Sequence, residues 1–132
     1  MAVRFEYDAK QQLLLITFDG ELLDEQLVSS YRLARQIGLR HEIKCGIIDG
    51  TGIVSFNISP DTVKSLAQHP TMFPERSRRC IVVPQDFLFG MARMYQALGG
   101  ETRDLLRVVR NLEEAYKYLD ITAPTNLTLV EE

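Results

Sequence analysis

Apolar and polar residues alternate at the beginning of the chain. Every second residue is apolar across positions 3–7, and the same period returns across positions 13–17, with Thr17 as its last member. Alternation with a period of two is typical of a strand that buries one face. The polar stretch 8–11 separates the two segments, so we predict a β-hairpin whose second strand ends at Asp19-Gly20.

The apolar spacing then changes to that of a helix. Leu23, Leu27, Tyr31 and Ala34 recur on one helical face, and Gly38 follows them. This pattern predicts a helix over about residues 24–37.

A third strand and a second helix are predicted next. Residues 45–48 form a short apolar strand, the glycine-rich segment 49–52 is typical of a turn, and residues 53–56 extend the strand beyond it. Ser59-Pro60-Asp61 then indicates a helix start, because serine caps helices, proline suits the first helical position and an acid favours the first turn.

The second half of the chain continues the alternation of strands and helices. Asp86 is a candidate cap for the third helix, which we expect to end at Gly99-Gly100. Asn111 and Glu114 have the spacing of a capping box. The predicted elements are a strand over 80–83, a helix over 86–98, a strand over 105–109 and a helix over 112–119.

This order of elements predicts an α/β fold. We expect a mixed sheet of about five strands with an N-terminal hairpin and four helices, forming a single domain over residues 1–121 with a frayed C-terminal tail over 122–132. Right-handed crossovers bring the carboxyl ends of parallel strands to one edge of the sheet, which is the usual place for a ligand.

Composition and charge reduce the number of function classes that fit the chain. The 132 residues are 45% hydrophobic and 25% charged with a formal net charge of -3, so the chain lacks the basic surface typical of proteins that bind nucleic acid. No uninterrupted apolar run is longer than that at 13–16, which is far short of the roughly 20 residues of a membrane span. The charged N-terminus lacks a signal-peptide core. The two cysteines are too few to staple a small secreted domain and lack metal-ligand spacing. Cys45 and Cys80 fall at the starts of strands that could be neighbours, and we expect buried, reduced thiols there. We expect a cytoplasmic protein.

The chain resembles a known family at three places. The first is the passage from Pro84-Gln85-Asp86 into residues 90–94, the second is residues 110–115, and the third is Tyr118-Leu119. Together with the order of elements, these residues are similar to the small bacterial SpoIIAA-like proteins of the STAS superfamily, which share the fold of the anti-sigma factor antagonists. The resemblance covers residues 3–120 and implies a mixed sheet backed by helices and a regulatory or binding role without catalysis.

One departure from that family concerns its phosphorylated serine. Residues 54–56 resemble the strand that precedes the serine, and Ser59 falls at the first position of the family's serine pair. Pro60 falls at the second position, which is the one that is phosphorylated. The resemblance therefore does not extend to a phosphoserine switch.

Two candidate binding surfaces emerge from the pattern. The first lies where three loops are expected to meet at the carboxyl edge of the sheet, next to helix N-termini that suit an anion or a carboxylate. The alternative is that its residues only form a turn and cap helices. The polar residues of this surface are Asp49, Thr51, Asn57, Ser59, Gln85 and Asp86.

The second candidate surface is the third helix. We expect one apolar face of this helix to pack on the sheet, with Gly90 allowing close approach. Leu88 and Phe89 then lie outside that face and suggest a protein partner or a homodimer, unless residues 71–74 cover them. The residues of the expected buried face are Phe87, Gly90, Met91, Met94, Tyr95 and Leu98.

Other chemistry has little support in the sequence. Arginines at 76, 78 and 79 form a basic cluster that suits phosphate, although such clusters are more often solvated loops. His41 and His69 lack metal-ligand spacing, and neither a nucleophile elbow nor a phosphate-binding glycine motif is present. We therefore expect no catalytic residues, no metal and no cofactor.

The leading hypothesis is a non-enzymatic module that binds a protein partner or a second copy of itself. The alternative, from a different class, is a carrier or sensor of a small apolar ligand or lipid. Phenylalanine and methionine together make adaptable apolar pockets, and this ligand would lie beside Phe87, Phe89, Met91 and Met94. An enzyme would require Asp49 or Asp86 to lie in a cleft.

Overall fold

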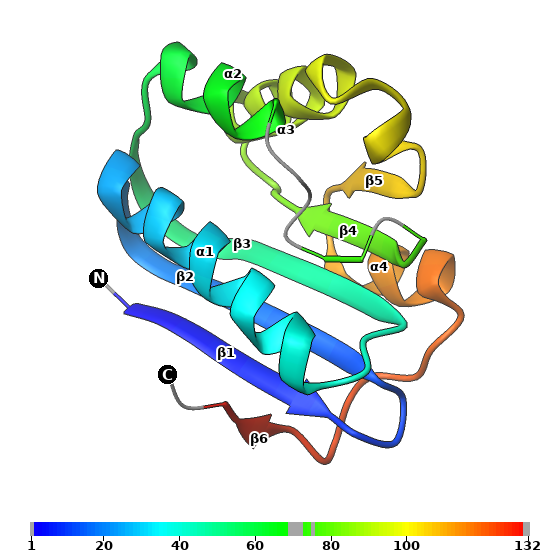
Figure 1. Ribbon diagram of the computed structural model, residues 1–132. Coiled ribbons are helices and arrows are strands. Elements are labelled where there is room, and N and C mark those ends of the chain that lie inside the picture. Colours follow the sequence, from blue (N-terminus) through cyan, green and yellow to red (C-terminus); the bar gives the residue numbers. More distant parts are fainter. Residues whose placement is uncertain (1, 69–72, 75, 131–132) are drawn as a thin grey trace.

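A mixed β-sheet with helices on both faces forms the protein (Figure 1). The computed structural model describes residues 2–68, 73–74 and 76–130. In chain order these residues form β1 (Ala2–Asp8), β2 (Leu13–Leu23), α1 (Asp24–Arg40), β3 (Cys45–Asn57), α2 (Pro60–Ala67), β4 (Arg78–Val82), α3 (Asp86–Leu98), the 3-10 helix η1 (Gly100–Arg103), β5 (Leu106–Val109), α4 (Leu112–Leu119) and β6 (Thr128–Leu129).

The strand order confirms the predicted α/β class. The sheet has the order β5-β4-β3-β2-β1-β6, in which β2, β3, β4 and β5 are parallel neighbours. β1 runs antiparallel to both β2 and β6, so the predicted N-terminal hairpin is present. The four helices are as expected among the described residues, but the sheet has six strands rather than five.

The additional strand comes from the segment that we expected to be frayed. β6, drawn in red in Figure 1, pairs with the edge strand β1, and the N–H of Val130 donates to the carbonyl of Phe5 at 2.8 Å. The Gln11 carboxamide also donates to the carbonyl of Thr122 and accepts its backbone N–H, at 3.1 Å each. The free edge of β1 offers unpaired backbone groups, which a following segment satisfies even without a strong strand pattern of its own.

The second strand continues past the glycine that we expected to end it. Gly20 adopts a left-handed conformation with φ of 83°, and the register of β2 with β3 shifts on both sides of it. A glycine in this conformation permits a β-bulge, after which pairing resumes. β2 therefore extends to Leu23, and Asp19-Gly20 marks a bulge instead of a strand end.

The third strand likewise runs through the expected turn at residues 49–52. Asp19 of β2 stands opposite Gly52 and Gly20 stands opposite Ile53, so the two strands stay paired along this stretch. The Asp49 carboxylate accepts the backbone N–H and the hydroxyl of Thr51, at 2.9 and 2.7 Å. Asp49 and Thr51 thus form the side-chain contacts typical of a turn, but the backbone stays in a strand because pairing with the neighbouring strand determines its path.

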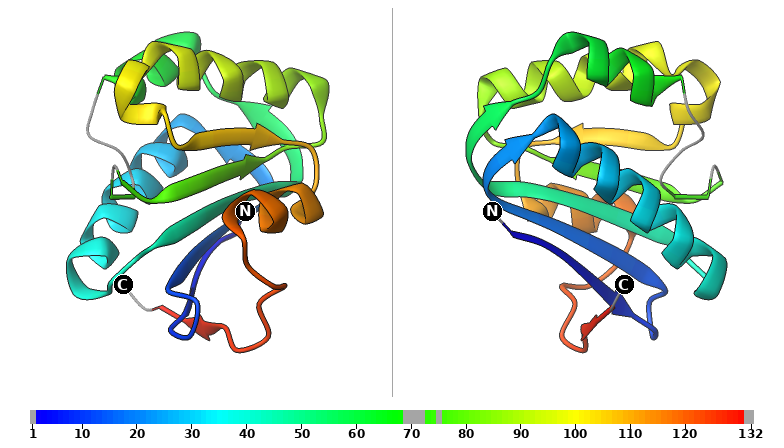
Figure 2. Two further views of the ribbon diagram at one scale, coloured as in Figure 1. Left: turned by 90° about the vertical axis from the view of Figure 1, so that its right-hand side faces the viewer. Right: turned by 60° about the vertical axis from the view of Figure 1, so that its left-hand side comes forward.

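The helices divide unequally between the two faces of the sheet. α1, α2 and α3 pack on one face over the largest apolar cluster, and α4 packs alone on the other face over a second cluster that includes both cysteines. The two views of Figure 2 show α4, in orange, apart from the other three helices. The side with three helices therefore holds most of the core.

The predicted helix starts are confirmed at two places. The Ser59 hydroxyl accepts the backbone N–H of Thr62 at 3.2 Å, and the Asn111 carboxamide accepts that of Glu114 at 2.9 Å. The capping box of α4 is incomplete, because Glu114 accepts the N–H of Arg110 instead of that of Asn111. Helix α1 continues to Arg40, two residues beyond Gly38, since a glycine inside a helix costs only about 1 kcal/mol.

Our prediction of which face α3 buries is wrong at both ends of the helix. Phe87 is 66% exposed and Leu98 is 46% exposed, whereas Leu88 and Ala92 are buried. Gly90 is exposed, and a methyl group added to it would meet nothing within 4 Å. The helix is rotated from the expected orientation, so Gly90 does not serve close packing.

Replacing Gly90 with alanine should therefore stabilise the protein. We expect Gly90→Ala to raise the free energy of unfolding by about 0.5–1 kcal/mol, because alanine loses less backbone entropy in a helix. The matched control is Gly46→Ala, whose added methyl group would overlap the ring of the buried Phe73 and should lower the free energy of unfolding by about 1–3 kcal/mol. Urea denaturation measures both changes, and a destabilised Gly90→Ala variant would contradict this placement of α3.

Candidate ligand-binding cavity

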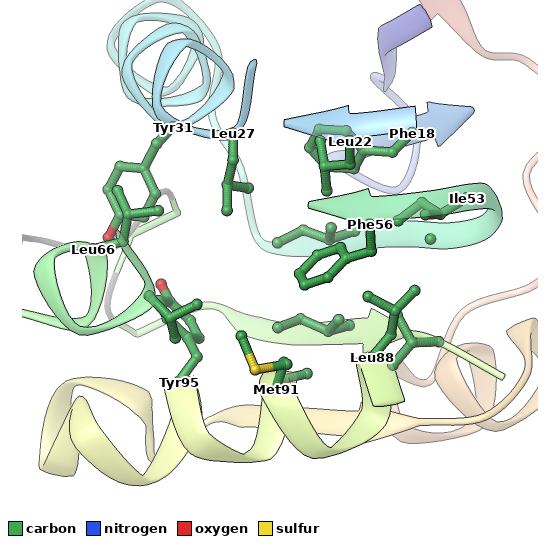
Figure 3. A pocket seen from close by; sticks show the side chains of 16 residues that line it. Phe18, Leu22, Leu27, Tyr31, Ile53, Phe56, Leu66, Leu88, Met91 and Tyr95 are labelled. Carbon is green, nitrogen blue, oxygen red and sulfur yellow. The ribbon is translucent and has the colours of Figure 1, made fainter. Parts of the chain in front are cut away.

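An apolar cavity lies between the sheet and helices α1, α2 and α3. Its volume is about 110 Å³. Figure 3 shows side chains from all three helices and from the middle of the sheet pointing into this space. The lining residues are Phe18, Leu22, Leu27, Tyr31, Ile48, Gly50, Ile53, Phe56, Val63, Leu66, Ile81, Val83, Leu88, Met91, Ala92 and Tyr95.

The alternation of side chains along each strand explains why the strand residues converge on this cavity. Phe18 and Ile48 point to the face of the sheet that carries three helices, whereas their neighbours along the strands point toward α4. Small residues among large ones leave the space open: Gly50 has no side chain, and Ala92 has only a methyl group. A methyl group on Gly50 would approach Val83 Cγ1 to 2.9 Å, so this glycine also allows the sheet and the β4–α3 connection to lie close together.

A buried arginine holds one end of the cavity. The Arg103 side chain is 2% exposed, and its guanidinium donates to the Tyr31 hydroxyl at 3.1 Å and to the Leu66 carbonyl at 3.2 Å. The same guanidinium lies 4.7 Å from the centre of the Tyr95 ring and donates to the Thr102 hydroxyl. Arg103 thus connects η1 to α1, α2 and α3, and we call this set of contacts the Arg103 clasp.

Tyr31 of the clasp brings no charge to the cavity. Burial, together with the neighbouring Tyr95 hydroxyl, raises the pKa of Tyr31 far above its ordinary value. Figure 3 shows the two hydroxyl oxygens at the same end of the cavity, and the neighbouring Tyr95 contributes to the raised pKa of Tyr31. The Tyr31 hydroxyl is therefore directed at Arg103, whose guanidinium lies over the Tyr95 ring, and the lining presents almost only carbon and sulfur.

The first predicted surface, at the carboxyl edge, does not form one shared polar site among the described residues. Asp49 is buried on the face that carries α4 and binds Thr51 on the same strand. Asn57 is exposed at the end of β3. The Ser59 N–H and hydroxyl both bind the Asp24 carboxylate, at 2.9 and 3.3 Å, which joins the starts of α1 and α2.

The remaining two residues of that surface bind elsewhere. The Gln85 carboxamide donates to the carbonyl of Ile53 at 3.0 Å, which fastens the start of α3 to β3. Asp86 does not cap α3 as expected, because Gln85 occupies the capping position. The Asp86 side chain is 95% exposed and forms an ion pair with Arg110 at 2.7 Å, so it does not lie in a cleft. These side chains act locally, as the alternative of turn and cap roles predicted.

The second predicted surface is only partly exposed. Leu88 is buried and lines the cavity, so our placement of this residue outside the core is wrong. Phe89 is half-buried, with the Arg110 guanidinium 4.0 Å from its ring centre. The segment 71–74, expected to cover both residues, lies partly outside the described residues. The exposed aromatic on this helix is Phe87, which meets the edge of the Phe56 ring at 5.8 Å between ring centres.

The four residues expected beside an apolar ligand have different positions. Met91 lines the cavity, whereas Met94 packs on the core without lining it. Phe87 and Phe89 contact Phe56 and Arg110 instead of the cavity. Phe18, Ile48, Ile53 and Phe56 fall within strands expected from the sequence but were not recognised as lining a cavity, and Leu22 lies beyond the expected end of β2. The sequence analysis also missed Arg103, which lies in a polar segment without a recognisable pattern.

The arginine cluster near β4 is not a single basic surface. Arg79 is buried and donates to the carbonyls of Pro74 and Thr102, at 3.3 and 2.9 Å, and burial lowers its pKa. Arg78 instead lies over the Tyr118 ring, and Arg76 is exposed. No group of described residues has the ligands for a metal ion, and His69 lies outside the described residues. No helix in the described part of the chain has the length and apolar character needed to cross a membrane.

The fold and the cavity together define an α/β protein with an apolar cavity beneath three of its helices. No protein-family model matches the chain, and no curated protein matches it.

The two cysteines give a prediction about reactivity. Both are free and buried, and burial raises the pKa of Cys45 to about 11 and that of Cys80 to about 12. At pH 8 a thiol with a pKa two units above the ordinary 9.0 has about a hundredfold less of the reactive thiolate. We expect both thiols to react with Ellman's reagent at least about 100-fold more slowly in the native protein than in urea.

The same shifts predict how stability depends on pH. The fold favours the neutral thiols, so their contribution is complete below about pH 9 and is lost as the pH rises toward 11 and 12. A Cys45→Ala, Cys80→Ala variant should lose less stability than the native chain over this range. In the labelling experiment, rapid reaction of the native protein with Ellman's reagent at pH 8 would contradict the burial of the two thiols.

Proposed function

We propose that this protein holds a small apolar molecule in the cavity beneath α1, α2 and α3, and acts as its carrier or sensor. The observation that carries the proposal is the cavity of about 110 Å³ with its apolar lining. Such an apolar lining favours apolar guests, because water against it finds almost no hydrogen-bond partners. The function is recognition, with no catalytic step.

The gain from filling the cavity supports this proposal. Protein interiors are otherwise close-packed. A ligand that fills the space restores contacts with the walls and buries its own apolar surface, at about 25 cal/mol per Å². Binding would therefore stabilise the fold by mass action.

A second candidate function is contact with a protein partner, the leading hypothesis from the sequence. The specific observation in its favour is that Phe87 and Val54 are 66% and 87% exposed. Phe87→Ser should then reduce the apparent mass in size-exclusion chromatography if a second copy covers this side chain. We also propose a cytoplasmic location and membership of the SpoIIAA-like group, in keeping with the resemblance of residues 84–94 and 110–119.

Two alanine-to-leucine substitutions on α3 test whether the cavity binds an apolar ligand. Ala92 is buried and lines the cavity, so Ala92→Leu fills it, whereas Ala97→Leu adds the same atoms to an exposed position of the same helix. Toluene binding is measured by isothermal titration calorimetry on protein refolded from urea, so that no carried molecule occupies the site. We expect Ala92→Leu to weaken binding at least about tenfold and Ala97→Leu to leave it unchanged.

Thermal unfolding verifies that both variants are folded. Equal toluene affinity in Ala92→Leu and the native chain would show that toluene binds elsewhere. Absence of toluene binding to the native chain would contradict the proposed function.

A further inference from the structure

The structure also indicates which class of ligand the cavity takes. Resting on the proposed function, we infer that the cavity takes a compact, uncharged molecule of about the size of a benzene ring, rather than a fatty acid or another long acyl chain. Three observations carry this inference: the chemistry of the lining, the direction of the nearest polar groups, and the volume.

The lining offers no partner for a charged group. None of the described residues that line the cavity carries a charge, and its hydroxyls are those of Tyr31 and Tyr95. A carboxylate moved into such a space loses its hydration without gaining an ion pair, which strongly disfavours binding. The ligand is therefore neutral.

The cation nearest to the cavity is already engaged with protein acceptors. Arg103 lies behind Tyr31 and donates to the Tyr31 hydroxyl, the Leu66 carbonyl and the Thr102 hydroxyl. Its guanidinium is also stacked on the Tyr95 ring. An acidic ligand would have to break these contacts to reach it. The clasp therefore forms the closed end of an apolar space and does not serve as a receptor for an acid.

The volume limits the size of the ligand. An engineered cavity of about 150 Å³ in another protein accommodates benzene, and the cavity here, at about 110 Å³, is somewhat smaller. Rings of Phe18, Phe56, Tyr31 and Tyr95 and the thioether of Met91 surround it. Aromatic edges and sulfur both make favourable contacts with a flat ring. A long acyl chain exceeds this volume, so most of its length would lie outside the apolar lining.

Leu88 sets the size limit on the side of α3. Its side chain is buried and points into the cavity, as Figure 3 shows. Truncation of this side chain to alanine lengthens the space along α3 without adding any polar group. Leu88 is thus the residue that we expect to determine specificity for ligand length.

A series of three probes tests the inference by calorimetry with the full chain. Toluene is neutral and compact, benzoate has the same ring with a charged group, and dodecanoate has a long chain with the same charged group. We expect toluene to bind at least about 100-fold more tightly than benzoate, and dodecanoate not to displace toluene. Benzoate or dodecanoate affinity equal to or greater than that of toluene would overturn the inference.

The outcomes separate this inference from the proposed function. If dodecanoate binds and toluene does not, the proposed carrier function stands, and the inference that the ligand is compact and uncharged is wrong. If none of the three probes binds, both proposals fail.

Two leucine variants provide a further test of the size limit. Leu88→Ala should increase the affinity for butylbenzene at least about fivefold relative to toluene, because it extends the cavity. Leu98→Ala is the matched control, since Leu98 is 46% exposed on the same helix and does not line the cavity. An unchanged ratio of butylbenzene to toluene affinity in a folded Leu88→Ala variant would show that Leu88 does not limit ligand length.

Discussion

The arrangement of the three helices above the sheet depends on the buried guanidinium of Arg103. A buried arginine presents several fixed donors, and each donor left without an acceptor is costly. Here the acceptors are the Tyr31 hydroxyl on α1 and the Leu66 carbonyl on α2, while the Tyr95 ring on α3 lies against the guanidinium. The planar geometry of these contacts fixes the distances among the helices more strictly than apolar packing alone would. The end of α3 and η1 are therefore held at a set height above the sheet.

This constraint accounts for the cavity beside it. Apolar side chains tend to close any space between them, since each unfilled volume loses dispersion contacts. At the clasp the helices cannot approach further without breaking polar contacts, and at the other end Gln85 fastens the start of α3 to the carbonyl of Ile53. Between these two attachments Gly50 and Ala92 have too little side chain to fill the gap. The site and the fold therefore share one explanation.

Local sequence patterns predicted the parts of the fold that depend on neighbouring residues. The hairpin, the four helices and the caps at Ser59 and Asn111 were predicted, because each depends on spacing within a few positions. The strands that continue through Gly20 and through residues 49–52 were not, because pairing with the adjacent strand outweighed local turn signals. The clasp was beyond such reasoning: Arg103 lies 72 positions from Tyr31 and 37 from Leu66. Met91 and Leu88 were selected from the sequence, but the strand residues that complete the cavity were not.

Xenon tests most directly whether the folded protein contains this apolar cavity, because xenon occupies apolar cavities without needing polar contacts. The chain has 4 methionines, so methyl signals of labelled methionine are few and separable by NMR. Under xenon pressure the Met91 methyl signal should shift in a saturable manner, because Met91 lines the cavity, while that of Met94 on the same helix should shift much less. Equal, unsaturable shifts of both signals, or no shift at Met91, would contradict the account.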